Sequence, residues 1–440
     1  MAISPVVAAR AASVAPDLPM VRARLDNGLR VVLAPDASAA VVAVAVTYDV
    51  GIRSEPEGRT GFAHLFEHLM FQGSEHIGKT EHFTYVQGAG GTLNGTTRMD
   101  YTNYYEMLPA QALELALFLE ADRMRSVRLT QENLENQVAV VKEEIRVNVL
   151  NRPYGGFPWL LLPPVLFETF PNAHDGYGDF RDLEAATIAD AESFFERYYA
   201  PANAALSIAG DVDVDAALAL VERHFSTIAP RPAPPRPSFA EPPPTRERRG
   251  MHVDPLAPQP ALAVGYRLPD PLEALDEFLP FVLLIEALAE GDASRLQRRL
   301  VQRDRLVTDI AAGIGVMGGA TDGRDPTPLI VQARHPATTG TEDVLAALDD
   351  EFARVTALGL EDGELQRLQA RWVGRYLRRI DHVMARAQTL GVQELQRGRP
   401  ELLTELPALI AAVDAERVQR AAAGLRPDAR AVLELRGGAA

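Results

Sequence analysis

The chain contains no cysteine among its 440 residues. Disulfide bonds, thiol catalysis and thiolate metal ligands are therefore excluded, and any transition metal must be held by histidine and carboxylate side chains. The sequence also has no run of the roughly 18 uninterrupted apolar residues that a membrane-spanning helix needs. We therefore expect no membrane partner.

Basic residues are fewer than acidic ones, with 44 Lys and Arg against 60 Asp and Glu and a net charge of -16. This balance argues against nucleic acids and anionic membranes as main partners. It favours neutral or basic substrates, although acidic surfaces also serve solubility alone. Hydrophobic residues make up 47% and charged residues 24%, as in ordinary globular proteins.

The N-terminal segment is rich in alanine and valine. Residues 1–16 carry Arg10 as their one basic residue and lack the basic start and apolar core of a complete signal peptide. We expect residues 1–20 to be a flexible segment.

A proline-rich stretch divides the chain near its middle. Residues 230–244 are too rich in proline for a helix or a central strand, and they predict an extended linker. We predict an N-terminal domain at residues 21–229, a linker at residues 230–250 and a C-terminal domain at residues 251–440.

Both halves show the same order of patterns, strands followed by helices. In the first half, strands are expected at residues 29–34 and 41–48, and helices at 61–71, 111–126 and 131–150. In the second half, strands are expected at residues 261–266, 309–316 and 328–334, with a long apolar helix at 273–290 and two further helices. The sequence predicts an α+β fold of two tandem homologous α/β-sandwich domains, each with a mixed, largely antiparallel sheet packed with helices.

Residues 64–68 have the sequence His-Leu-Phe-Glu-His. On an α-helix, positions i, i+3 and i+4 share a face, so His64, Glu67 and His68 point the same way. Two imidazoles can hold one metal ion while the carboxylate between them reaches a water molecule. The pattern, which inverts the commoner His-Glu-x-x-His, predicts a zinc hydrolase. The simpler alternative is a helix with two partly buried histidines and a surface glutamate.

A catalytic zinc site usually needs a third protein ligand. The best candidates are Glu143 and Glu144, on the helix expected at residues 131–150. Neighbouring residues on a helix point about 100° apart, so normally only one of the two can face a site. Helical spacing leaves both open, and a solvated acidic pair is the simpler alternative.

These residues resemble the pitrilysin family of zinc metallopeptidases, which includes insulin-degrading enzyme and the mitochondrial processing peptidase. The chain is similar to the short, two-domain bacterial branch over nearly its whole length. The segments that carry the resemblance, besides the motif and the glutamate pair, are Gly51–Gly73, the strand around Asn94, Tyr104-Tyr105, Tyr198–Asn203, Ala209–Asp211 and Ala293–Leu296. The resemblance implies a soluble protein of the bacterial cytoplasm or periplasm, and it leaves the choice between these compartments open.

The resemblance also implies a set of site residues. The family's spacing after the second histidine places the third ligand at Glu144, with Glu143 as the alternative. Relatives often carry a glutamate seven residues before this ligand. Gln137 stands there in this chain and would support the site by hydrogen bonding, with weaker zinc binding expected because an amide adds no charge.

The implied activity is hydrolysis of peptide bonds in short or unfolded peptides, with Zn²⁺ as cofactor and Glu67 as the general base for the attacking water. In similar enzymes, an extended peptide adds itself as a strand beside the active-site helix. Asn94, Gly95 and Thr96 occupy the matching segment and are the expected substrate-binding residues. An ordinary turn is the alternative for Asn94-Gly95.

One part of the family's pattern is missing. Members that cleave alone or as homodimers usually carry an arginine and a tyrosine seven residues apart, after a Ser-Arg-Leu segment. The corresponding places are Val301 and Thr308, and no tyrosine lies between Tyr266 and Tyr376. A shifted alignment could supply the arginine. We therefore expect a heterodimer in which a homologous zinc-less subunit provides the Arg/Tyr pair and the two chains close like a clam shell, with a homodimer as the alternative.

The competing function is a non-catalytic structural or assembly subunit of the same family, as in the respiratory bc1 complex. Such members usually have degraded metal motifs, whereas this chain keeps the complete motif. His76 and His82 are expected to be surface histidines in a loop.

Overall fold

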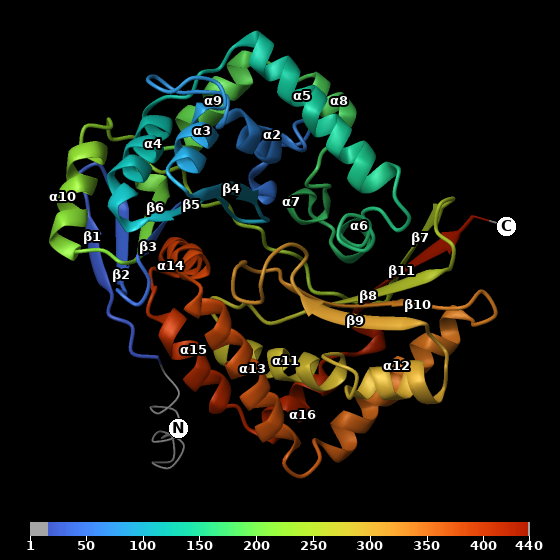
Figure 1. Ribbon diagram of the computed structural model, residues 1–440. Helices are drawn as coiled ribbons and strands as arrows, with labels where there is room; N and C mark the ends of the chain where they lie inside the picture. Colours follow the sequence, from blue (N-terminus) through green and yellow to red (C-terminus); the bar gives the residue numbers. More distant parts are fainter. Residues whose placement is uncertain (1–15, 439–440) are drawn as a thin grey trace.

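A computed structural model gives the structure of residues 16–438, in which two sheets, each covered by helices, follow one another along the chain (Figure 1). This confirms the predicted α+β fold class. Most of the N-terminal segment expected to be flexible, residues 1–15, lies outside the described residues. Among residues 16–438, no helix is both long and apolar enough to cross a membrane.

The first sheet has six strands in the order β1-β2-β6-β3-β5-β4. Their bounds are β1 Val21–Arg24, β2 Arg30–Pro35, β3 Val41–Tyr48, β4 Thr92–Thr97, β5 Thr102–Pro109 and β6 Ala204–Gly210. Only β2 and β6 run parallel, and the other pairs are antiparallel. Strand β4 therefore ends the sheet and has β5 as its partner on one side.

The second sheet has five strands in the order β7-β11-β8-β10-β9. Their bounds are β7 Arg248–Asp254, β8 Ala261–Arg267, β9 Asp309–Ile314, β10 Pro328–Arg334 and β11 Arg430–Gly437. Here too a single pair, β7 and β11, runs parallel. The strands β7, β8, β9, β10 and β11 correspond in chain order to β2, β3, β4, β5 and β6. With this correspondence the second sheet has the same strand order as the first sheet without β1, as expected for a duplicated unit.

Helices cover both sheets (Figure 1). Those of the first half are α2 Phe62–Leu69, α3 Glu81–Gly88, α4 Leu113–Arg125, α5 Gln131–Ile145, α6 Pro163–Leu166, α7 Phe170–Ala173, α8 Phe180–Glu184, α9 Ile188–Tyr198 and α10 Val214–Phe225. Those of the second half are α11 Leu275–Leu288, α12 Thr341–Leu358, α13 Glu364–Asp381, α14 Val383–Arg397, α15 Leu402–Ala411 and α16 Ala415–Ala423.

Several elements of the structure were not predicted, and two of the differences concern long helical regions. The helix expected at residues 131–150 ends as an α-helix at Ile145 and continues as a π-helical turn over Arg146–Leu150. Pro153 follows closely, and a proline prevents the helix from continuing. In the second half, five helices rather than two follow β10. The prediction undercounted them, although α13 and α16 each carry an apolar face at helical spacing.

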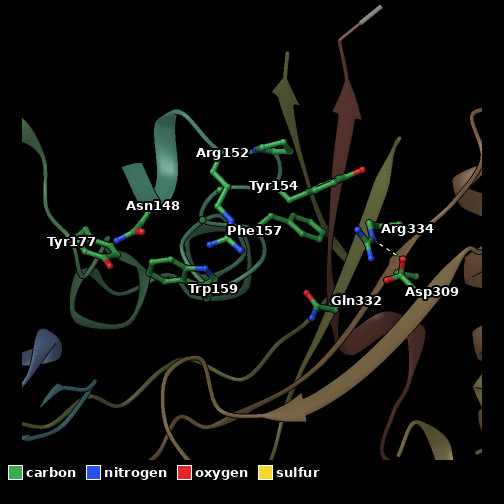
Figure 2. A pocket seen from close by; sticks show the side chains of 13 residues that line it. Asn148, Arg152, Tyr154, Phe157, Trp159, Tyr177, Asp309, Gln332 and Arg334 are labelled. Carbon is green, nitrogen blue, oxygen red and sulfur yellow. Dashed lines mark hydrogen bonds and ion pairs between the residues drawn. The ribbon is translucent and has the colours of Figure 1, made fainter. Parts of the chain in front are cut away.

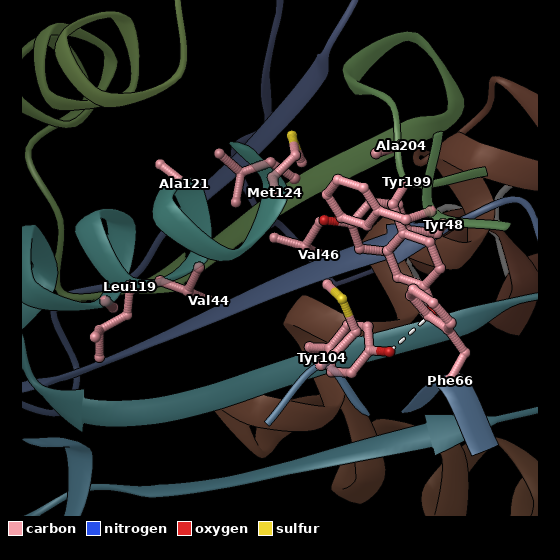
Figure 3. Close-up of a cluster of buried hydrophobic side chains, with 14 of the residues drawn as sticks. Val44, Val46, Tyr48, Phe66, Tyr104, Leu119, Ala121, Met124, Tyr199 and Ala204 are labelled. Atoms are coloured by element: carbon pink, nitrogen blue, oxygen red, sulfur yellow. Dashed lines mark hydrogen bonds between the residues drawn. The ribbon is translucent and has the colours of Figure 1, made fainter. Parts of the chain in front are cut away.

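The core of the first half packs α2 and α4 against the inner face of the sheet (Figure 3). Tyr48 of β3 and Phe66 of α2 both contact Tyr199, with ring centroids 4.5 and 4.7 Å apart. The Tyr104 hydroxyl bonds that of Tyr199 at 3.0 Å, so two phenol groups are satisfied inside an apolar core. This aromatic cluster fixes the position of α2.

Each half lends one helix to the other half's sheet. Helix α14, from the second half, packs on β3 and β6, where Ala387 and Leu390 join a buried cluster with Ala43 and Ala45. Helix α6, from the first half, packs on the second sheet in the same way, with Leu162, Leu166 and Phe167 against Ala263, Ile330 and Leu433. The outer face of each sheet is therefore covered by the opposite half.

Candidate metal centre

Helix α2 presents the motif to one side because its other side is apolar. Phe62, Leu65, Phe66 and Leu69 recur at i, i+3, i+4 and i+7 and are all buried. The three motif residues lie on the opposite face and are only partly buried. The burial pattern of the helix thus orients the two imidazoles and the carboxylate together.

A buried glutamate holds the start of this helix. Glu55 accepts hydrogen bonds from the backbone N–H groups of Gly61 and Ala63, at 2.9 and 2.7 Å, which would otherwise lack partners at a helix N-terminus. The Nε2 atom of His174 lies 3.0 Å from the same carboxylate. Gly61 has φ +79° and lies against the backbone of Tyr177, so a side chain there would be strained. Glu55 and His174 are 119 residues apart, so no local pattern in the sequence indicates this contact.

The structure brings His64, His68 and Glu144 together. Nε2 of His64 lies 3.7 Å from Oε2 of Glu144, and Nε2 of His68 lies 3.7 Å from its Oε1. One ligand atom from each of the three residues can be chosen so that all lie within 4.8 Å of one another. Glu144 reaches this position from α5. The N-cap of this helix is Thr130, whose hydroxyl accepts the Asn133 N–H at 3.1 Å.

The neighbouring glutamate faces away from this cluster. Glu143 is exposed, and its carboxylate pairs with Arg146 at 3.1 Å. The two glutamates thus take different directions from one helix, as the 100° step per residue requires. Geometry separates them where helical spacing alone could not.

The three side chains fit a zinc ion. Nitrogen and oxygen ligands of tetrahedral zinc lie about 2.0–2.2 Å from the metal, which places them roughly 3.3–3.6 Å from one another. The separations of 3.7 Å between each imidazole Nε2 and the Glu144 carboxylate are close to this value. Two imidazoles and one carboxylate are also a known donor set for catalytic zinc.

Burial changes the proton affinities at the cluster. Burial, together with the neighbouring His68, lowers the pKa of His64 to about 3. His64 is therefore neutral at physiological pH and does not have to lose a proton to bind a metal. Burial raises the pKa of Glu67, and the charge of Glu144 raises it further. The hydrogen bond from Thr97 and the charge of His68 act in the opposite direction. A raised pKa makes this carboxylate a better proton acceptor.

Strand β4 holds Glu67 in place. The Thr97 hydroxyl donates a 2.6 Å hydrogen bond to Oε2 of Glu67, which leaves Oε1 as the oxygen available to other partners. Gly95 lies against the same side chain, because a Cβ added there would be 2.9 Å from Cγ and 3.0 Å from Oε1 of Glu67. The glycine is needed for close packing between the strand and the carboxylate.

The predicted substrate-binding segment lies on β4. Asn94 is exposed and its Oδ1 accepts the N–H of Gly95 at 2.9 Å, while the Thr96 hydroxyl bonds that of Tyr105 at 3.1 Å. Asn94 and Gly95 pair with β5 within the strand, so the alternative of an ordinary turn is wrong. Among the described residues no strand pairs with the outer side of β4. An extended peptide could add there, and the binding role of these residues stays a prediction.

Gln137 is buried on α5 and lies on the same face of this helix as Glu144. Its Nε2 donates to Oδ1 of Asn136 at 2.9 Å. Within residues 16–438, no hydrogen bond joins its amide to the two histidines or to Glu144. Its supporting role at the metal centre therefore stays a prediction.

Two other clusters combine histidine with acidic groups. His82 was expected on the surface in a loop, and this is wrong, because it lies buried in α3 with Nε2 3.3 Å from Glu106. Glu120 completes this cluster, but it pairs with the buried Arg123, whose charge opposes a cation there. His76 is exposed, as expected, and binds Asp122 at 2.6 Å. Asp122 also accepts bonds from Ser74 and the His76 backbone, which leaves it few free lone pairs.

The second half carries no equivalent of the metal cluster on α11. Counting back from Gly291 as from Gly73, the motif positions fall on Val282, Ile285 and Glu286. Glu286 is buried and binds Arg371 of α13 at 3.0 Å, and it also pairs with Arg375. Two guanidinium groups therefore neutralise the acid at this position, and a cation is not needed.

Other side chains stand at the two positions where the family resemblance implies an arginine and a tyrosine. Val301 lies in the π-helical segment Gln297–Arg303 and packs against the second core. The Thr308 hydroxyl contacts Oε1 of Gln259 and the backbone oxygen of Arg334, each at 3.1 Å. Neither residue can supply a cation or a phenol.

Comparison with known proteins identifies the family. Residues 30–153 match the family model described as insulinase (peptidase family M16), and residues 185–371 match the one described as peptidase M16 inactive domain. The chain belongs to the M16 peptidase family. The three residues of the metal cluster all lie in the first match, and the second covers α11, which lacks them.

Among curated relatives, the zinc protease PqqE of Helicobacter pylori is 31% identical over 293 residues, which span 64% of this chain and 64% of that protein. A probable mitochondrial-processing peptidase subunit beta of Arabidopsis thaliana is 24% identical over 405 residues, 90% of this chain and 74% of that protein. The name zinc protease supports zinc as the family's metal. The second relative is named as a subunit.

A solved structure of a protease from Helicobacter pylori has the same fold. It superposes with a TM-score of 0.86 and 23% identity and covers 95% of this chain and all of the other chain. The two-domain M16 fold is thus shared over almost the whole chain.

Proposed function

We propose that this M16 chain is a zinc-dependent endopeptidase that hydrolyses short or unfolded peptides. The observation that carries the proposal is the convergence of His64, His68 and Glu144 beside Glu67, next to the free edge of β4. The family's zinc peptidases and the donor set both support Zn²⁺ as the metal held by the first three residues.

A bound zinc ion would supply Lewis-acid chemistry, lowering the pKa of water and polarising a peptide carbonyl. The chain's own residues do the rest. Glu67, anchored at Oε2 by Thr97, accepts the proton of the attacking water at Oε1 and later delivers it to the leaving amine. The free N–H and C=O groups of β4 hold the peptide backbone in extended form, which gives affinity for many sequences.

The catalytic role is tested with Glu67→Gln, which keeps the shape and removes the basic oxygen. We expect zinc content equal to that of the wild type, measured by elemental analysis, and loss of peptide hydrolysis, measured by mass spectrometry of a peptide mixture. Glu143→Gln is the matched control, because that residue faces solvent, and it should retain both. Hydrolysis retained in Glu67→Gln would rule out Glu67 as the base, and a wild-type protein that binds no zinc would favour a structural subunit.

We further propose that a second, homologous subunit completes the substrate site. This is supported by the absence of a tyrosine between Tyr266 and Tyr376 and by the side chains at Val301 and Thr308. The two chains would enclose the peptide in a chamber. We expect the purified chain to have low activity, and we expect a large increase when a homologue that carries the Arg/Tyr pair is added. Full activity of a homodimer would contradict the proposal of a second subunit.

A further inference from the structure

A cavity of about 590 Å³ lies beside the metal centre, and Figure 2 shows the side chains that line the cavity. Tyr177 forms the wall between them, because its ring packs edge-on against His64, with centroids 5.1 Å apart, and against Trp159 at 5.4 Å. The opposite wall is built by Gln332 and Arg334 of β10. The cavity thus lies between the zinc-bearing half and the second sheet, where the residues flanking a cleaved bond would extend.

The lining of this cavity combines polar groups with four aromatic side chains. Tyr154, Phe157, Trp159 and Tyr177 all contribute to it, and each is only partly buried, so their faces remain open to a ligand. Such rings offer a large apolar area and a fixed shape to a bound side chain.

The charges of the cavity are unequal. Arg334 binds Asp309 at 2.5 Å and lies over the Tyr154 ring at 5.5 Å, so its charge is already balanced. Arg152 also lines the cavity, and Figure 2 shows its side chain extending toward Trp159. Within residues 16–438, Arg152 has no ion pair and no side-chain hydrogen bond. One cation therefore remains uncompensated here, in a chain whose net charge is -16.

We propose that this cavity selects peptides that place a carboxylate in it, and that Arg152 is the residue that recognises the carboxylate. This rests on the proposed function only in taking the ligand to be a peptide. Arg152 is exposed, and a guanidinium group can hold a carboxylate through two parallel hydrogen bonds. The rings of Trp159 and Tyr177 pack on the carbon atoms that carry the acid. The carboxylate belongs either to an Asp or Glu side chain or to the C-terminus of a short peptide.

This preference differs from the one expected from the composition. The acidic surface favours neutral or basic substrates at long range, but a lysine or arginine side chain in this cavity would meet the charge of Arg152. Specificity depends on the groups that touch the ligand, and repulsion of the wrong ligand contributes as much as attraction of the right one.

The chain offers an optical probe for the test, because it has two tryptophans, Trp159 and Trp372. Trp372→Phe removes the second one, and Glu67→Gln prevents turnover, so the fluorescence of Trp159 reports binding in the full-length protein. Peptides that differ only by Glu, Gln or Lys at one position are titrated, each as a C-terminal acid and as an amide. Arg152→Gln and Arg152→Lys are compared in this background, with Arg378→Gln, an exposed arginine outside the cavity, as the matched control.

We expect the carboxylate peptide to bind about five- to tenfold more tightly than its uncharged partner, as for a charge-assisted bond that is partly open to solvent. Arg152→Gln should abolish the difference, Arg152→Lys should keep part of it, and Arg378→Gln should keep all of it. Loss of the preference on amidation assigns the C-terminal carboxylate, and its persistence assigns the side chain. Equal affinity for the Glu and Gln peptides, a preference for Lys, or no change in Trp159 fluorescence would overturn the proposal.

The experiments distinguish failure of the proposed catalytic function from failure of carboxylate recognition by Arg152. If the zinc-loaded wild type does not cleave peptides yet Trp159 reports carboxylate-dependent binding, the recognition by Arg152 stands and the catalytic proposal falls. If the wild type cleaves peptides regardless of their charge, the reverse holds.

Discussion

Replacing Gly95 by alanine should impair catalysis without disturbing the fold. The added methyl carbon would lie 2.9 Å from Cγ, 3.0 Å from Oε1 and 3.2 Å from Cδ of Glu67. Carbon atoms in contact are normally about 3.5–4.0 Å apart, so the strand and the side chain must separate by roughly 0.6–1 Å. The 2.6 Å bond from Thr97 prevents Glu67 from yielding freely. A displacement of this size at a reacting group costs about 100-fold in rate.

The assay is cleavage of a fluorogenic peptide, with kcat and KM determined separately and zinc content measured on the same samples. We expect kcat of Gly95→Ala to fall about 100-fold at unchanged zinc content, with Tm close to that of the wild type. Gly313→Ala is the matched control, because Gly313 also lies in an edge strand, β9, and a Cβ there meets nothing within 4 Å. Activity of Gly95→Ala within about threefold of the wild type would refute the view that the strand positions Glu67 through this contact.

Three further predictions concern other groups of the first half. Glu144→Gln should lower zinc affinity about 10- to 100-fold or more, whereas Glu143→Gln should leave it unchanged, as measured by competition with a chelator; equal effects would contradict the assignment. Thr97→Val should reduce kcat about tenfold at constant zinc content, because Glu67 loses its anchor; an unchanged kcat in the peptide assay would show that the anchor is dispensable. Burial raises the pKa of Glu106 from 4.5 to about 8. The folded protein then keeps a proton that the unfolded chain loses, so the free energy of unfolding should fall between about pH 4.5 and 8, by at most roughly 1.4 kcal/mol per pH unit. Glu106→Gln should flatten this slope in urea titrations, and an unchanged slope would contradict the buried-acid explanation.

The sequence was sufficient for features that depend on local periodicity. The apolar stripe of α2 and the polar face with His64, Glu67 and His68 alternate with helical period, so the helix and the direction of its motif could both be predicted. The strand before α2 follows from an equally local pattern. The duplicated order of strands was also visible, because the two halves repeat the same succession of elements.

Features that depend on distant contacts could not be predicted. Glu55 and His174 are separated by 119 residues, and nothing in either local sequence shows that they meet. The burial of His82 was not predicted, because its partner, Glu106, stands on a strand 24 residues farther along the chain. The choice between the two glutamates of α5 required the position of α2, which only the packed core fixes.

The exchange of helices between the halves has a consequence for how the molecule can be divided. A fragment ending within residues 230–250 would lack α14, and its first sheet would expose Ala43 and Ala45 to water; the complementary fragment would lack α6 and expose Ile330 and Leu433. Each fragment would then expose an apolar sheet face that the other fragment covers in the intact protein. The two fragments should therefore aggregate when they are made separately. They should recover zinc binding when they are synthesised together. The covalent link through the proline-rich segment is then not required for folding, but each half requires the other.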